Sequence, residues 1–140
     1  MNRDVNVRVI GTHRDSDGIC NEVVSECDGI YALRAGKHFL IYNEELEGTT
    51  QVTRNLVTVG INEVVVSKSG AVGTRIEFAG GTLRDVEYDT GFGKIHVNVR
   101  TKNIMTLQEK HSLRIVIDYN LEMDGEVISE CKIDILATDK

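Results

Sequence analysis

The chain has 140 residues, 41% hydrophobic and 27% charged, and this composition excludes a disordered chain. Its net charge of −6 argues against a nucleic-acid-binding protein, which usually carries a basic face. No apolar run approaches the ~20 residues that cross a bilayer, and the N-terminus lacks the apolar core of a signal peptide. We therefore expect a cytoplasmic protein with no nucleic-acid or membrane partner.

Alternating apolar and polar residues predict strands along almost the whole chain. The predicted strands cover residues 5–9, 19–33, 38–46, 49–59, 63–68, 71–78, 82–88, 94–101, 113–123 and 127–135. Turn residues separate them, and Asp124-Gly125 is a strong hairpin signal. Asp28-Gly29 indicates a bulge or bend inside the second strand. Only residues 106–112 are compatible with a short helical turn.

This pattern predicts one all-β domain over residues 1–140. Short turns between successive strands favour an antiparallel up-and-down meander of about eight to ten strands. Closing such a meander into a β-barrel removes its exposed edges. The inside of a barrel of this size is either filled by side chains or holds one small ligand.

Four stretches, taken in order, resemble the YwiB-like family, a bacterial domain of unknown function with a lipocalin-like, or calycin-like, β-barrel. They are residues 36–53, 67–72, 88–104 and 113–135. The chain departs from the family where Thr90-Gly91-Phe92-Gly93 replaces a Thr-Pro-Tyr-Gly type of turn, and the segment at 53–62 looks longer than usual. The resemblance implies a lipocalin-like barrel and no established activity. Because the chain has no tryptophan, it lacks the Gly-x-Trp signature of true lipocalins, and the likeness to them is one of architecture.

Asp89-Thr90-Gly91 is the tripeptide that carries the catalytic carboxylate of aspartic proteases. Those enzymes need two aspartates that share a proton. The residue after their glycine is normally Ala or Ser, whereas here it is Phe92. They also carry a hydrophobic-hydrophobic-Gly segment downstream, but after Gly93 the only glycine is Gly125, in a predicted hairpin. We therefore interpret the tripeptide as a turn between strands and reject a protease function.

The histidines and cysteines form no recognisable metal or catalytic pattern. The histidines, which lack ligand spacing, are His13, His38, His96 and His111. Solvent-facing side chains are therefore expected, although a metal or haem site that assembles in space around His38 or His111 stays open. The cysteines, odd in number and without a base nearby in sequence, are Cys20, Cys27 and Cys131. Reduced thiols are expected, some of them packed as small hydrophobes. The sequence predicts no cofactor, no metal site and no catalytic residue, and leaves open whether the protein is an enzyme.

The strand at 38–46 carries the best candidates for a ligand site. Tyr42 and Glu44 share one face of it with Leu40, and if that face points inward they become polar groups in a barrel cavity. The predicted ligand contacts are Tyr42, Glu44, Tyr88, Phe92 and Tyr119. An inward Glu44 has a raised pKa unless a cation pairs with it. Arg75 and Arg100 are candidates for that cation, although their neighbours in sequence indicate that both point outward.

The opposite orientation is also compatible with the sequence. Phe39 and Ile41 would then point inward and Glu44 would be exposed, as glutamates commonly are. Both faces of the strand carry apolar residues, so the alternation alone does not decide between the two orientations.

Three functions are compatible with these observations. The first is a barrel that binds a small, partly apolar ligand. The second is a protein-interaction or structural module with a filled barrel and an exposed apolar patch, used for example in a homodimer. The third is a hydrolase or isomerase that uses a carboxylate such as Glu44.

Overall fold

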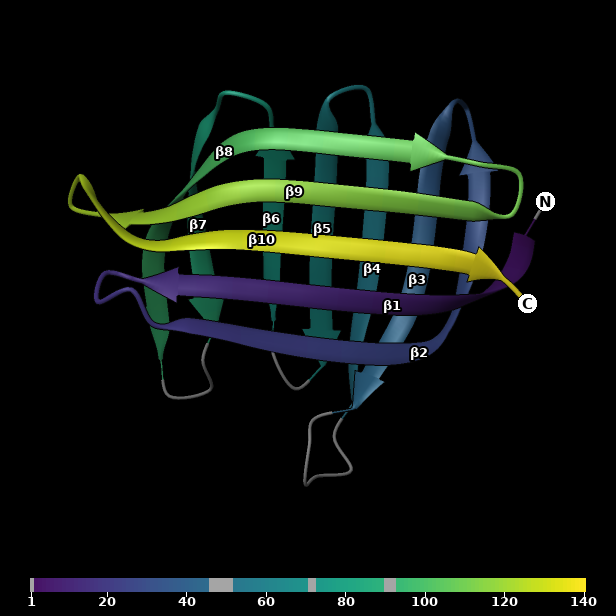
Figure 1. Cartoon of the computed structure of the whole chain (residues 1–140), viewed down its shortest axis with the longest axis horizontal. Coiled ribbons are helices and arrows are strands. Elements are labelled where there is room, and N and C mark those ends of the chain that lie inside the picture. Colours follow the sequence, from purple (N-terminus) through teal and green to yellow (C-terminus); the bar gives the residue numbers. More distant parts are fainter. Residues whose placement is uncertain (1, 46–51, 71–72, 90–92) are drawn as a thin grey trace.

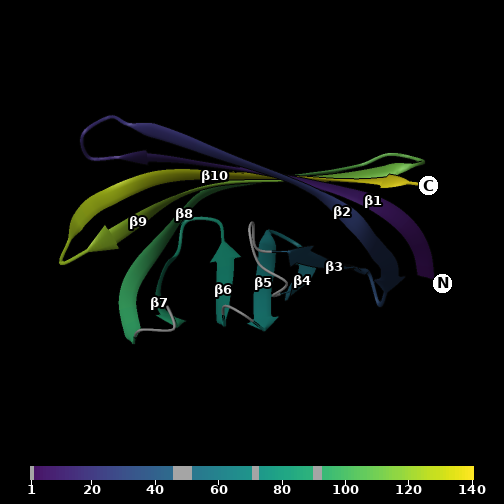
Figure 2. The same cartoon turned by 90° about the horizontal axis from the view of Figure 1, so that it is seen from below.

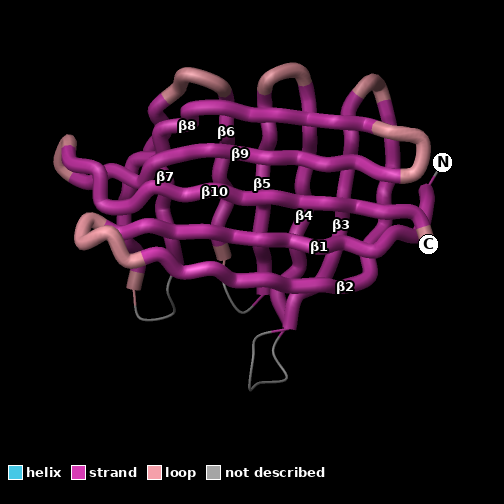
Figure 3. The backbone as a smooth tube through the Cα atoms, in the orientation of Figure 1, coloured by secondary structure: helices cyan, strands magenta, loops and turns pink. Residues whose placement is uncertain are grey.

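The computed structural model describes residues 2–45, 52–70, 73–89 and 93–140, and these residues form ten strands and no helix (Figure 3). The strands are β1 (Asn2–Asp15), β2 (Cys20–Arg34), β3 (Lys37–Glu45), β4 (Val52–Gly60), β5 (Glu63–Gly70), β6 (Thr74–Ala79), β7 (Leu83–Asp89), β8 (Lys94–Gln108), β9 (Ser112–Met123) and β10 (Glu126–Asp139). Across these ranges there is accordingly no helix with the length and apolar character needed to cross a membrane.

All ten strands belong to one antiparallel sheet, in the order β6-β5-β4-β3-β2-β1-β10-β9-β8-β7. Strands that follow each other in the chain are therefore neighbours in the sheet, except at the seam between β6 and β7. The first and last strands also pair, from Val5 with Asp139 to Asp15 with Ser129. This arrangement confirms the predicted up-and-down meander.

The sheet curls over into two layers that enclose the core. Figure 2 shows β8, β9, β10 and β1 in one layer and β3 to β7 in the other, and β2 lies beside β1 and bends at one end towards β3. In Figure 1 the long strands of the first layer cross in front of those of the second. Two backbone hydrogen bonds tie the β6–β7 connection to β8: Gly81 N donates to Thr101 O at 3.1 Å, and Thr101 N donates to Thr82 O at 3.0 Å. The result is the all-β, nearly closed barrel that the sequence predicts.

Alternate residues of each strand face the core, as a period of two requires. The largest fully buried apolar side chains are Phe78, Leu40, Ile115, Ile117, Ile135, Val7, Val57, Val59, Val64 and Val99. The hairpin predicted at Asp124-Gly125 is confirmed: both residues have positive φ, 53° and 80°, between the paired Met123 and Glu126. These are the dihedral signs of the two-residue turn that matches strand twist.

Of the two alternatives at Asp28-Gly29, a bulge is not present: β2 keeps an unbroken register with β1 through both residues, and its pairing with β3 begins at Gly29. The described bulges lie in β8 and β10 instead, between Thr101 and Asn103 and between Val127 and Ser129. Residues 106–112 form no helical turn, since β8 continues to Gln108 and a tight turn leads into β9.

Candidate functional site

A cavity of about 340 Å³ lies inside the barrel, and strands of both layers line it. Most of its wall is apolar and consists of Val9, Val23, Val66, Ile76, Phe78, Tyr119, Ile133 and Ile135. The rings of Phe78 and Tyr119 pack against each other with centroids 4.9 Å apart. The volume falls within the ~300–1,000 Å³ typical of small-molecule sites.

One part of the wall is polar and is formed by Ser25, Tyr42, Glu44 and Lys68, here called the polar cluster. Lys68 Nζ lies 3.4 Å from Glu44 Oε1, and Ser25 Oγ lies 3.4 Å from Glu44 Oε2. Both distances are long for hydrogen bonds. The Glu44 carboxylate therefore keeps the capacity to accept a shorter hydrogen bond from a bound molecule.

Tyr42 is the buried member of the polar cluster, with 3% of its surface exposed. Burial raises the pKa of its phenol, and the negative charge of Glu44 raises it further. The phenol therefore stays protonated at physiological pH and can both donate and accept a hydrogen bond.

Unpaired oxygen atoms lie beside the polar cluster. Asn55 pairs across the sheet with Tyr42 on one side and Lys68 on the other, and it is fully buried. Its Nδ2 donates to Thr53 O at 3.4 Å, but its Oδ1 has no partner among the residues described. Thr74 Oγ1, on the cavity wall, also has no hydrogen-bond partner among the residues described. A buried polar atom without a partner costs about 1–3 kcal/mol, so a ligand or a water that pairs with the Thr74 hydroxyl on the wall is favoured.

The barrel brings His13 beside Cys131, although no base lies near this cysteine in the sequence. The two residues pair across β1 and β10, with Cys131 Sγ 3.2 Å from His13 Nδ1. Burial raises the pKa of the Cys131 thiol, while hydrogen bonds to Ser129 and Tyr119 partly oppose that effect. The thiol therefore stays protonated, and the contact gives no activated nucleophile.

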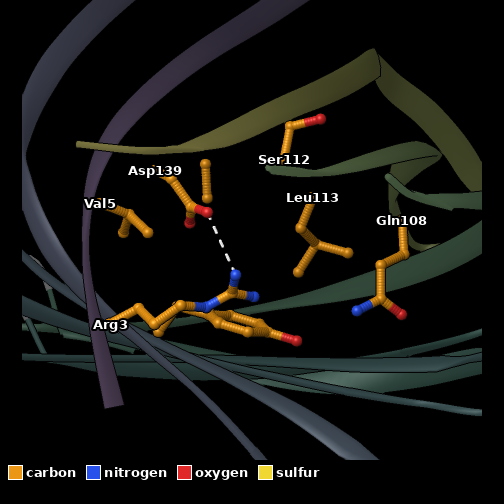
Figure 4. Close-up of a pocket in the computed structure, with 8 residues that line it drawn as sticks. Arg3, Val5, Gln108, Ser112, Leu113 and Asp139 are labelled. Atoms are coloured by element: carbon orange, nitrogen blue, oxygen red, sulfur yellow. Dashed lines mark hydrogen bonds and ion pairs between the residues drawn. The ribbon is translucent and has the colours of Figure 1, made fainter. Parts of the chain in front are cut away.

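The barrel end near both chain termini is closed by side chains (Figure 4). Arg3 Nη1 pairs with Asp139 Oδ2 at 3.1 Å, and the Arg3 guanidinium lies 5.1 Å from the centre of the Tyr31 ring. The Tyr31 hydroxyl in turn lies 2.7 Å from His38 Nδ1. The space left between these groups and β9 is about 10 Å³, enough for about one water molecule.

The structure places three of the five predicted ligand contacts on the cavity wall: Tyr42, Glu44 and Tyr119. Tyr88 belongs to β7, but its side chain is outside the description, and Phe92 lies outside the described residues. The orientation with Phe39 and Ile41 inward is wrong. These two half-buried side chains lie on the outer face. Leu40, the residue between them, faces inward in one row with its cross-strand partners, Tyr31 on β2 and Val57 on β4.

The cation that pairs with Glu44 is Lys68, and neither of the two candidates considered from the sequence, Arg75 and Arg100, does so. Arg75 Nη1 pairs with Glu77 at 2.8 Å, and Arg100 Nε donates to the buried Glu122 at 2.5 Å. The alternation in β5 carries a signal for Lys68, since Val64 and Val66 face inward and the same period reaches Lys68. Because lysines are ordinarily exposed, the sequence alone does not indicate that this position faces inward.

The segment around Asp89 forms a hairpin arm, as predicted. β7 ends at Asp89, which pairs with Lys94 at the start of β8. Thr90, Gly91 and Phe92 lie outside the described residues.

In the described ranges, no three His, Cys, Asp or Glu side chains come together in a way that can hold a metal ion. His111 Nδ1 lies 3.1 Å from Asp139 Oδ2, and the exposed His96 lies 3.6 Å from Glu87. The half-buried His38 lies against Tyr31, so the four histidines occupy separate places in the fold.

Comparison with known proteins identifies the family. The family described as "Domain of unknown function (DUF1934)" matches residues 7–135. The "Uncharacterized beta-barrel protein YwiB" of Bacillus subtilis (strain 168) is 28% identical over 112 residues, which are 80% of this chain and 78% of that protein. The structure described as "Crystal structure of ywiB protein from Bacillus subtilis" is 24% identical, with a TM-score of 0.87 over 99% of this chain and 93% of the other. That structural likeness supports the fold alone. The expected YwiB-like resemblance is confirmed, and the chain belongs to the DUF1934 family of β-barrel proteins of unknown function.

Proposed function

We propose that this protein binds a small, partly apolar molecule inside its barrel. The observation that carries the proposal is the cavity of about 340 Å³, whose wall is apolar except for the polar cluster. A concave apolar site with a few convergent polar groups is the usual form of a small-molecule site. Barrels of similar size, such as those of lipocalins, hold one small ligand in this position.

The chemistry of the polar cluster favours a ligand whose polar end carries hydrogen-bond donors. The wall carries one carboxylate, that of Glu44, whose contacts with Lys68 Nζ and Ser25 Oγ are long, and the hydroxyls of Ser25, Tyr42 and Thr74 can each donate as well as accept. A ligand amine or hydroxyl can donate to the Glu44 carboxylate, whereas a second carboxylate is repelled by it. The apolar part of the ligand then packs against Phe78 and the aliphatic wall.

Gly11 offers a direct test, because it lines the cavity and a Cβ built there meets no heavy atom within 4 Å. In Gly11→Leu the new side chain fills part of the cavity without displacing backbone. The probe is 1-aminoanthracene, an apolar fluorophore with one amino group. We expect saturable binding to the wild type and at least ~10-fold weaker binding to Gly11→Leu. Anthracene-1-carboxylate, of similar size but anionic, is expected to bind more weakly than the amine to the wild type.

Thr12→Leu is the matched control, since Thr12 is the next residue of β1 and points to the opposite face. It adds the same leucine outside the barrel and is expected to leave binding unchanged. Equal binding of the amine to all three proteins would place the probe elsewhere and refute the proposal. Native mass spectrometry of protein purified from its own host is the complementary measurement, and Gly11→Leu is expected to lose any retained small molecule that the wild type carries.

A further inference from the structure

In the part of the chain that the structure describes, the barrel is closed at one end and open at the other. Strand β1 runs from the closed end, near both chain termini, towards the open one. Along its inward face Val5 and Val7 are buried, Val9 and Gly11 are half-buried, and His13 is exposed. The inward face of β1 therefore leaves the covered interior as the strand approaches its hairpin with β2.

Strand β2 shows the same gradient in the reverse chain direction. Tyr31, at the closed end, is buried, whereas Val23 is 65% exposed. Val23 pairs with Gly11 and lines the cavity, so it belongs to the inward face. An inward-facing apolar side chain with this exposure is in contact with solvent. The cavity therefore opens to solvent at the end where the β1–β2 hairpin lies.

The cavity is apolar at its floor and polar at its opening. Phe78, Ile135 and Tyr119 form the floor, and all three are buried. In contrast, the side chains of Glu44 and Lys68 retain 26% and 35% of their exposure. The polar cluster thus extends from the buried Tyr42 outward to two charged groups that water reaches.

The strand pairing explains why these charged groups lie at the opening. The pairing of β2 with β3 begins at Gly29, which lies opposite Tyr42. Ser25 and Glu44 lie beyond this point, where the two strands have separated, and their side-chain oxygens are 3.4 Å apart. A ligand group that binds Glu44 is therefore close to solvent, whereas one that packs against Phe78 is not.

We propose that the ligand binds end-on through this opening, with its apolar end on the floor and its polar end beside Glu44 and Lys68, in contact with water. This inference rests on the binding function proposed above and adds the orientation and the class of the ligand. A volume of about 340 Å³ is near the lower limit for small-molecule sites. A larger molecule fits only if the rest of it leaves through the opening, where a polar remainder stays hydrated. The site therefore accepts an apolar group that is linked through its amine or hydroxyl end to a larger polar molecule.

Two isomeric probes test the orientation by fluorescence titration. Both are 1-aminoanthracene with a tetraethylene glycol chain, attached in one to the nitrogen and in the other to the ring carbon farthest from the nitrogen. In the nitrogen-linked probe the chain leaves at the opening, so binding within ~3-fold of unsubstituted 1-aminoanthracene is expected. In the ring-linked probe the polar chain would lie against the apolar floor, so binding at least ~30-fold weaker is expected.

The outcomes separate this inference from the function on which it rests. If 1-aminoanthracene itself does not bind, the binding function is refuted and the inference with it. If it binds and loses affinity in Gly11→Leu, but the ring-linked probe binds as well as the nitrogen-linked one, the cavity site stands and the end-on orientation is overturned.

The rate of binding tests the route of entry. Val23→Trp enlarges a side chain at the opening, and stopped-flow fluorescence is expected to show association of 1-aminoanthracene at least ~5-fold slower than in the wild type. Val24→Trp is the matched control, because Val24 is exposed on the outer face of β2, and its rate is expected to stay unchanged. Arg3→Ala removes a side chain that covers the closed end and is also expected to leave the rate unchanged.

A circular-dichroism melt verifies that each variant is folded. Entry at the open end is contradicted if Val23→Trp and Val24→Trp bind the probe at the same rate, or if Arg3→Ala binds it faster than the wild type.

Discussion

Gly29 provides a sharp test of how the barrel is packed. It faces inward on β2, between its cross-strand neighbours Val5 on β1 and Tyr42 on β3. A Cβ built there would lie 2.7 Å from Val7 Cγ2 and 2.8 Å from Ile41 O. Contacts this short are not tolerated, and the second involves backbone, so the strands would have to move apart. We therefore expect Gly29→Ala to strain β2 at the point where its pairing with β3 begins.

The expected magnitude follows from two opposing effects. Overpacking a core position costs about 1–3 kcal/mol. Replacing a strand glycine by alanine contributes about 0.5–1 kcal/mol of stability through the unfolded chain. Gly29→Ala should then lower the free energy of unfolding by about 1 kcal/mol. For a chain of this length that corresponds to a fall in Tm of roughly 4 °C.

Gly11→Ala is the matched control, because the same substitution in the neighbouring strand meets open space. It should raise the free energy of unfolding by about 0.5–1 kcal/mol. Urea unfolding followed by circular dichroism gives both values, with the m-value as a check on two-state behaviour. If the two variants change stability in the same direction, or Gly29→Ala loses less than about 0.5 kcal/mol, the close approach of β1 and β3 at Gly29 is refuted.

Two further predictions concern polar groups that the fold partly buries. Arg100→Met removes the partner of Glu122, whose side chain is only 10% exposed, and should cost about 1–3 kcal/mol in urea unfolding at neutral pH. Burial lowers the pKa of His38 from its ordinary value of 6.5, so the folded state binds this proton less readily than the unfolded state. The free energy of unfolding should therefore fall as pH drops from 6.5 through the lowered pKa, and His38→Gln should remove that part of the pH dependence.

Each of these predictions has a control on the surface. Arg75→Met breaks the exposed pair with Glu77 and should change stability by less than about 0.5 kcal/mol. His96→Gln replaces an exposed histidine and should leave the pH dependence as in the wild type. A loss in Arg100→Met no larger than in Arg75→Met would contradict the role given to the buried Glu122. A pH profile of His38→Gln identical to that of the wild type would contradict the role given to His38.

The sequence predicted most of the fold because a half-buried strand can be recognised from its alternating apolar and polar residues. The alternation Leu113, Ile115, Ile117 marks an inward row by itself, and Asp124-Gly125 supplies a turn whose dihedral signs few other residues adopt. With turns this short, each strand can reach only its neighbour, which leaves the meander as the topology. At Asp28-Gly29 the sequence left a bulge and a bend open, because glycine marks both bulges and close strand approaches, and only the packed neighbours tell them apart.

The candidate site was less accessible to sequence reasoning. Tyr42 and Glu44 were recognised as a pair, but β3 has apolar residues on both faces, so their orientation depends on the strands beside it. Lys68 was missed because charged residues are ordinarily exposed, and only the barrel surrounds its inward position with a carboxylate.

What the sequence by itself determined is the list of strands, their turns and the order in which they pair, because these depend on local periodicity and short connections. What only the tertiary structure decided is which face points inward and which distant residues meet. His13 and Cys131 are 118 positions apart and become neighbours because β1 pairs with β10. Glu44 on β3 and Lys68 on β5 meet on the two sides of β4, because both side chains lie on the inward face of the sheet. Side-chain period is a local property, whereas a cavity exists only when the sheet has curled round to face itself.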